Sequence, residues 1–226
     1  MSTTFDVYPS QANIPTFSEV LDLSNVYLRK FLAKHGIHRS FQIDVDIKKY
    51  IDSDKADISV PFVKSEAAKW NADEYAWFFV EGRLGGSDAY FCKFEDRDWL
   101  DDDEKTVEAF VEGRFLEREK TRIYERELRN CFNNGFYWWF RRSAGQPAII
   151  NLSYGMIAAA FAKLTDGIIE SIDCAWNGLL FPVQADEFVL HYFDPDCPNL
   201  ECGDWAKCCL DDIQTTNYYY KENETC

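Results

Sequence analysis

The feature that most constrains the fold is residues 148–162, a run that contains no charged side chain. Crossing a membrane takes about 20 consecutive apolar residues, so we expect this shorter run to be buried inside a folded protein. Its small residues share one face of a helix, and they are Ala148, Asn151, Gly155, Ala159 and Ala162. Pro147 suits the first helical turn and Gly167 suits the end. The run therefore predicts a closely packed helix over 147–163.

Enough apolar material surrounds this helix to build a core. The chain has 226 residues, of which 46% are hydrophobic and 16% aromatic. A disordered chain of high net charge would be poor in such residues. We expect a single folded domain over residues 1–226. If this domain is divided in two, we expect the boundary at residues 95–104.

The first half of the chain carries mainly strand patterns. Residues 41–47 alternate apolar and polar side chains, which is typical of a strand with one buried face. Three further segments are rich in β-branched and aromatic side chains, namely 58–63, 75–80 and 89–94. Gly82, Gly85 and Gly86 separate the last two, so these two strands are predicted to form a hairpin.

Helical spacing appears elsewhere. Residues 17–32 and 105–132 carry apolar side chains at helical intervals, with Ser18 or Ser24 as candidate caps of the first helix. A strand pattern covers 168–173, and 185–193 fits a short helix or a strand. The elements predict an α+β fold, an antiparallel sheet from the N-terminal half with packed helices from the C-terminal half. The strand at 168–173 is a candidate member of the same sheet.

The net charge of the chain limits the classes of molecule that it is expected to bind. The chain has 24 basic and 39 acidic residues, a net charge of −15. Residues 95–104 contribute −6 (seven acids, one arginine) and 186–226 contribute −8 (ten acids, two lysines). Such a field repels nucleic acids and anionic lipids but speeds association with a cationic protein. Acidity that serves only solubility is the competing interpretation.

The first residues of the chain indicate its cellular location, and the spacing of the cysteines indicates whether they could bind a metal. Residues 1–6 have neither a basic start nor an apolar core, so we expect no secretory signal and a cytoplasmic protein with reduced thiols. Cys197, Cys202, Cys208 and Cys209 are spaced C-x4-C and C-x5-C-C, without the C-x2-C knuckle of zinc sites. A zinc site or a disulfide stays open there, but we predict neither a bound metal nor a cofactor.

An alternative hypothesis makes the chain a small hydrolase. Ser153 lies in Asn-Leu-Ser-Tyr-Gly, which resembles a nucleophile elbow, and Asp173 and His191 follow in the order of an α/β-hydrolase. However, Ser153 falls inside a predicted helix, where an elbow serine cannot sit. A carboxylate-bound metal is the other form of this alternative, but no pair of acids stands out.

Residues 135–142 form the densest aromatic cluster, Gly-Phe-Tyr-Trp-Trp-Phe-Arg-Arg. Such a cluster can stack on nucleotide bases. The sequence has no glycine-rich phosphate loop, and the global charge opposes nucleic acids. We therefore predict core packing by the aromatic rings, with Arg141 and Arg142 pairing nearby carboxylates.

Part of the chain resembles a known kind of protein. Residues 140–147 (FRRSAGQP), the helix that ends in Leu164-Thr165-Asp166-Gly167, and residues 168–176 (IIESIDCAW) are similar to a pattern in immunity proteins encoded beside bacterial polymorphic and contact-delivered toxins. The resemblance covers about a quarter of the chain. It implies a cytoplasmic inhibitor that occludes a toxin domain and carries no catalytic residues.

The favoured interpretation is therefore an acidic protein that neutralises a basic toxin domain by electrostatically steered docking. We expect the contacts to come from the acidic run, the turn near residue 173 and the acidic tail. The predicted partner-binding residues are Asp101, Asp102, Asp103, Glu104, Asp173, Trp176, Asp194 and Asp196. A third hypothesis is a subunit of a larger cytoplasmic assembly.

Overall fold

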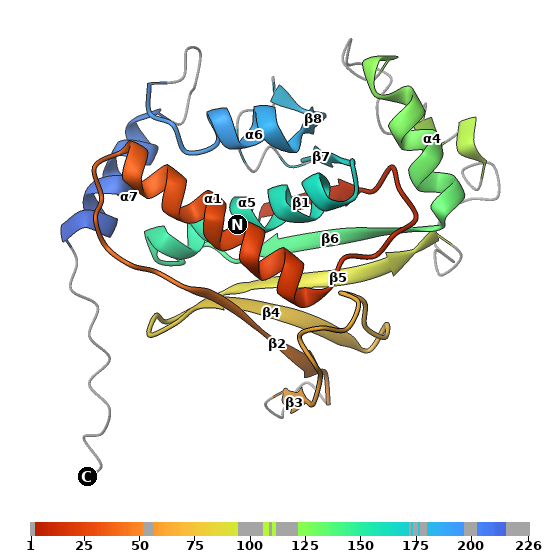
Figure 1. Ribbon diagram of the computed structural model, residues 1–226, viewed down its shortest axis with the longest axis horizontal. Helices are drawn as coiled ribbons and strands as arrows, with labels where there is room; N and C mark the ends of the chain where they lie inside the picture. Colours follow the sequence, from red (N-terminus) through yellow and green to blue (C-terminus); the bar gives the residue numbers. More distant parts are fainter. Residues whose placement is uncertain are drawn as a thin grey trace.

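An eight-stranded antiparallel sheet organises the molecule (Figure 1). The computed structural model describes residues 3–51, 57–94, 106–108, 110–111, 122–171, 173, 176, 180–196 and 203–215. Its strands are β1 (Thr3–Tyr8), β2 (Ile43–Lys49), β3 (Ile58–Val60), β4 (Glu74–Val80), β5 (Ser87–Lys93), β6 (Phe136–Arg142), β7 (Ile168–Glu170) and β8 (Val183–Gln184). Its helices are α1 (Phe17–Lys34), α4 (Glu125–Asn134), α5 (Ala148–Leu164), α6 (Ala185–His191) and α7 (Gly203–Thr215).

The strand order is β3-β2-β4-β5-β6-β1-β7-β8, and every neighbouring pair is antiparallel. The predicted α+β class is confirmed. The sheet nevertheless takes strands from both halves of the chain, since β6, β7 and β8 complete it, and α1 from the first half joins the helical layer. The aromatic segment around residue 138 forms β6, next to the centre of the sheet.

The uncharged run forms α5, as predicted, and it is buried along nearly its whole length. It lies between the sheet and helices α1, α6 and α7. Its small residues allow close approach: a Cβ added at Gly155 would lie 2.1 Å from the ring of Tyr192. The same tyrosine donates a hydrogen bond to the carbonyl of Asn151 at 2.6 Å. A helix with larger residues on this face could not accept the ring.

Helix α1 begins and ends through local side-chain chemistry. Thr16 is its N-cap and exchanges hydrogen bonds with Glu19 in a capping box. The predicted caps were wrong, because Ser18 already lies in the first turn and Ser24 lies inside the helix, where its hydroxyl donates to the carbonyl of Val20. The helix ends at His35, and Gly36 follows with a positive φ of 69°.

The helix predicted over 105–132 is not continuous in the part that the structure describes. Residues 107–108, 110–111 and 122–123 are helical, but Tyr124 has φ −105° and ψ 13° and caps α4, which starts at Glu125. The rest of 105–132 lies outside the described residues.

The two faces of the sheet are covered differently (Figure 1). Helices α1 and α5 cover one face and enclose the main core. On the other face, α4 together with Val107, Phe110 and Val111 covers a smaller apolar cluster that includes Tyr8, Leu128 and Tyr137. Cys92, near the end of β5, packs against this cluster. Over β2 and β4, no helix of the described residues packs on this second face.

Candidate functional site

The uncovered part of the second sheet face is the candidate site. We call it the open sheet face and define it by the outward residues of four neighbouring strands: Asp44, Asp46, Lys48, Tyr75, Trp77, Phe79, Asp88, Tyr90, Trp139 and Arg141. Antiparallel sheets with one solvated face usually alternate apolar-in and polar-out residues. Here half of the outward residues are aromatic, which core formation does not require.

A row of aromatic rings crosses the open sheet face. The ring centroids are 4.9 Å apart for Tyr50 and Tyr75, 6.0 Å for Tyr75 and Tyr90, and 4.9 Å for Tyr90 and Trp139. The hydroxyl of Tyr75 donates to Asp57 at 2.7 Å. The hydroxyls of Tyr50 and Tyr90 lie 2.5 Å apart. These contacts fix the rings in place; Tyr50 is exposed, Tyr90 and Trp139 are half-buried, and Tyr75 is buried beneath its neighbours.

Trp77 contacts two neighbouring residues, Lys48 and Gly86. The ammonium of Lys48 lies 4.8 Å from the centre of its ring, a cation–π contact. Its six-membered ring lies against Gly86, where an added Cβ would be 2.6 Å from the ring carbons. Glycine is needed at position 86 because the ring and the backbone both approach it closely.

Asp88 lies between Trp77 and Arg141 on adjacent strands. Only 17% of its side chain is exposed, and the nearest Arg141 nitrogen is 3.9 Å from its Oδ2. Burial raises the pKa of Asp88, although Arg141, the Tyr90 hydroxyl and Lys48 oppose this shift. The carboxylate is thus incompletely compensated by the protein's own cations.

Acids outnumber bases on the second sheet face. Its strand positions hold five acids (Asp6, Asp44, Asp46, Asp88, Glu170) and two bases (Lys48, Arg141), and of these Asp6 and Glu170 are buried. Lys64 from a neighbouring loop binds Asp44 at 2.6 Å. Fixed aromatic rings among carboxylates can hold cationic groups by cation–π and charge-assisted contacts.

The predicted partner-binding residues fall in different places. Asp101, Asp102, Asp103 and Glu104 lie outside the described residues. Asp173 is exposed and accepts hydrogen bonds from Thr4 (3.1 Å) and Ser171 (3.2 Å). Since Thr4 is the strand partner of Arg141, Asp173 lies at the border of the open sheet face.

Trp176 does not fit the predicted contact role. It is 2% exposed, and its ring packs between Tyr192 and Phe193 with centroids 5.1 Å from each. The exposed tryptophan of this cluster is Trp205 of α7, which contacts Phe193. Trp176 is a core residue because its ring packs against Tyr192 and Phe193, which directly follow α6.

Asp194 and Asp196 lie near the end of α1, in the layer on the opposite side of the sheet. Lys34 binds Asp194 at 2.5 Å, and the amide of Asp196 donates to the same carboxylate. Burial alone would raise the pKa of Asp194, but these hydrogen bonds and the charge of Lys34 lower it overall. Asp194 is therefore already neutralised within the chain, whereas Asp196 is exposed.

The hydrolase hypothesis finds no matching geometry. Ser153 is 3% exposed inside α5, and its hydroxyl donates to the carbonyl of Ile150 at 3.1 Å. A nucleophile must reach substrate, and this one cannot. Among the described residues, no group of three histidine, cysteine or acidic side chains is placed to hold a metal ion. Cys208 is exposed and Cys209 buried, while Cys197 and Cys202 lie outside the described residues.

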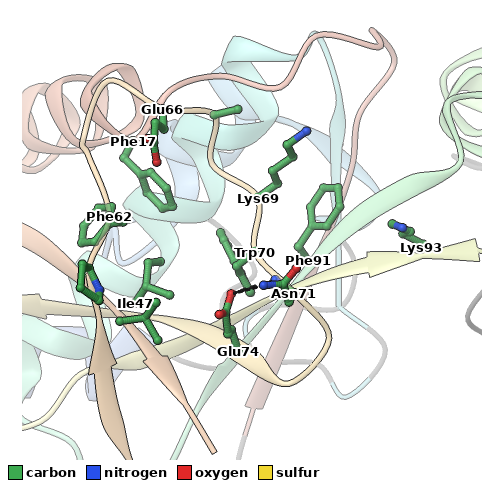
Figure 2. Close-up of a pocket in the computed structure, with 13 residues that line it drawn as sticks. Phe17, Ile47, Phe62, Glu66, Lys69, Trp70, Asn71, Glu74, Phe91 and Lys93 are labelled. Atoms are coloured by element: carbon green, nitrogen blue, oxygen red, sulfur yellow. Dashed lines mark hydrogen bonds between the residues drawn. The ribbon is translucent and has the colours of Figure 1, made fainter.

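A pocket of about 470 Å³ opens on the helical side, near the start of α1 (Figure 2). Phe17, Phe62, Trp70 and Phe91 form its walls and pack against one another. Of the charged groups that line it, Glu74 accepts two hydrogen bonds from Asn71. Glu66, Lys69 and Lys93 also line the pocket.

Comparison of the chain with protein-family models, curated proteins and solved structures gave no match. Within the described residues, no helix has the length and apolar character needed to cross a membrane. The candidate site is therefore defined by its own geometry.

Proposed function

We propose that this chain is an acidic binding protein that neutralises a cognate toxin by covering a basic surface of the toxin domain. In this role it acts in the bacterial cytoplasm as an immunity protein. The observation that carries the proposal is the open sheet face, where ordered aromatic rings alternate with carboxylates. Tyrosine and tryptophan are enriched among the residues that dominate binding energy at protein interfaces.

Electrostatics supports the same choice. The net charge of −15 speeds encounter with a cationic partner. Asp173 extends the acidic surface beyond the open sheet face. A stable interface needs a complementary shape and the removal of water from apolar area, as well as opposite charge. The fixed aromatic row supplies the shape and the apolar area. A hydrolase is the weaker hypothesis, because Ser153 is enclosed in α5.

The test is neutralisation. The protein encoded next to this chain's gene should be expressed in bacteria with and without the chain, and growth and complex formation measured. We expect growth to be restored and the association rate to fall steeply with salt. Trp77→Ala should weaken the complex, whereas Asp186→Asn on α6 should not. A neighbouring toxin that the chain fails to bind would refute the proposal.

A further inference from the structure

We propose that the open sheet face contains an arginine-selective site formed by Trp77, Asp88 and Tyr90. This inference rests on the proposed function and names the chemistry of the partner, a surface segment that inserts an arginine side chain at this point. Asp88 would accept the guanidinium, and the neighbouring rings would stack on it.

The protein already places its own cations around this point. The Lys48 ammonium lies over the Trp77 ring at 4.8 Å, and Arg141 approaches Asp88 to 3.9 Å. Both contacts show that a positive group is accommodated here. Neither completes the site, because Lys48 faces the ring rather than the carboxylate, and 3.9 Å is too long for a hydrogen bond.

Asp88 retains capacity for a second cation. Its Oδ2 receives the long contacts from Tyr90 (3.5 Å) and Arg141 (3.9 Å). Its Oδ1 accepts no hydrogen bond from any residue that the structure describes. A guanidinium can engage a carboxylate through two parallel N–H groups, so an incoming arginine would use the oxygen that the chain leaves available.

Surrounding charge favours a cationic occupant. Asp46 is the strand partner of Trp77, and Asp57 lies nearby, bound by the Tyr75 hydroxyl. This part of the open sheet face and its border thus hold three carboxylates (Asp46, Asp57, Asp88) and two cations, Lys48 and Arg141. The site is complementary to one more positive side chain.

Arginine fits this site better than lysine. Asp88 is only 17% exposed, so a bound cation must give up much of its water. Guanidinium is weakly hydrated, planar and able to stack on aromatic rings, whereas ammonium is a compact and strongly hydrated charge. The mostly buried carboxylate and the fixed rings both favour the planar group.

The experiment compares two peptide probes on the whole chain. Calorimetric titration with acetylated tetra-arginine and tetra-lysine at low ionic strength should give at least roughly tenfold tighter binding of the arginine peptide, the gain expected from added stacking and bidentate contact. Asp88→Asn and, independently, Trp77→Leu should remove this preference. Asp186→Asn is the matched control, since it removes one exposed acid elsewhere and should leave the preference intact.

Equal affinity for the two peptides, or a preference that survives both Asp88→Asn and Trp77→Leu in folded protein, would overturn the inference. The two proposals fail separately. If the chain neutralises its toxin but does not prefer arginine, the proposed function stands and the arginine site is refuted. If the chain prefers arginine but neutralises no toxin, the arginine site stands and the proposed function is refuted.

Discussion

Gly155→Ala should destabilise the protein, although alanine is the better helix former. The substitution gains about 0.5–1 kcal/mol of helix propensity. Against this, the new Cβ would lie 2.1–2.6 Å from three ring carbons of Tyr192. That ring cannot swing aside, because Phe188 (4.7 Å), Phe193 (5.0 Å) and Trp176 (5.1 Å) enclose it.

The magnitude follows from two terms. Overpacking a dense core costs about 1–3 kcal/mol, and loss of the buried hydrogen bond from Tyr192 to Asn151 costs about 1–3 kcal/mol more. After subtracting the propensity gain, we expect a net loss of about 1–5 kcal/mol. For a chain of this size, that lowers Tm by roughly 2–20 °C.

Urea unfolding and calorimetry measure this loss directly. The matched background is Tyr192→Leu, which removes the ring. There, alanine at position 155 should be neutral or should stabilise by up to about 1 kcal/mol. If Gly155→Ala leaves the wild-type Tm unchanged or raises it, the reasoning about this contact is refuted.

Three further predictions concern other parts of the molecule. Gly86→Ala should cost about 1–3 kcal/mol and change tryptophan fluorescence, because its Cβ would lie 2.5 Å from a backbone carbonyl and 2.6 Å from the Trp77 ring; unchanged spectra and Tm would contradict this. Thr16→Ala should cost about 1 kcal/mol in urea unfolding by removing the capping box with Glu19, and a loss near zero would argue against the cap. Folding raises the pKa of Asp88, chiefly through burial, so its ionisation opposes folding above the folded-state pKa and has no effect below the unfolded-state value. Asp88→Asn should therefore stabilise the protein at pH 7, with a gain that disappears as the pH falls through that window in urea titrations; a gain independent of pH would refute this.

Local patterns in the sequence predicted much of the secondary structure. The uncharged run 148–162 gave α5, the spacing in 17–32 gave α1, and the alternation in 41–47 gave β2 to within two residues at each end. These elements follow from which side chains must avoid water, and that requirement acts over a few neighbouring residues. The α+β class followed from their order.

The order of the strands in the sheet could not be predicted from local sequence patterns. Thr3–Tyr8 carried no strand prediction, yet β1 lies between β6 and β7. The aromatic density of residues 136–142 predicted core packing correctly for Trp138 and Phe140, but not that the segment is a strand. Strand order depends on contacts between distant segments, which leave no periodic trace in either segment.

The candidate site was missed for a related reason. Tyr75, Trp77 and Phe79 alternate along one strand, and this is the signal that could have been used, because their inward neighbours Ala76, Phe78 and Val80 already supply the core face. An apolar residue on both sides of a strand indicates either full burial or a binding face. Only the absence of a described helix over this face of β2 and β4 distinguishes the two cases.

The position of β1 has a consequence for synthesis. Thr3 pairs with Arg142, 139 residues later, and Asp6 pairs with Glu170 on the other side. On a ribosome, β1 emerges long before either neighbouring strand. Its backbone N–H and C=O groups therefore stay unpaired until most of the chain has been translated. Such non-local pairing slows folding. The complete sheet, and any binding face on it, can form only after the second half of the chain has emerged.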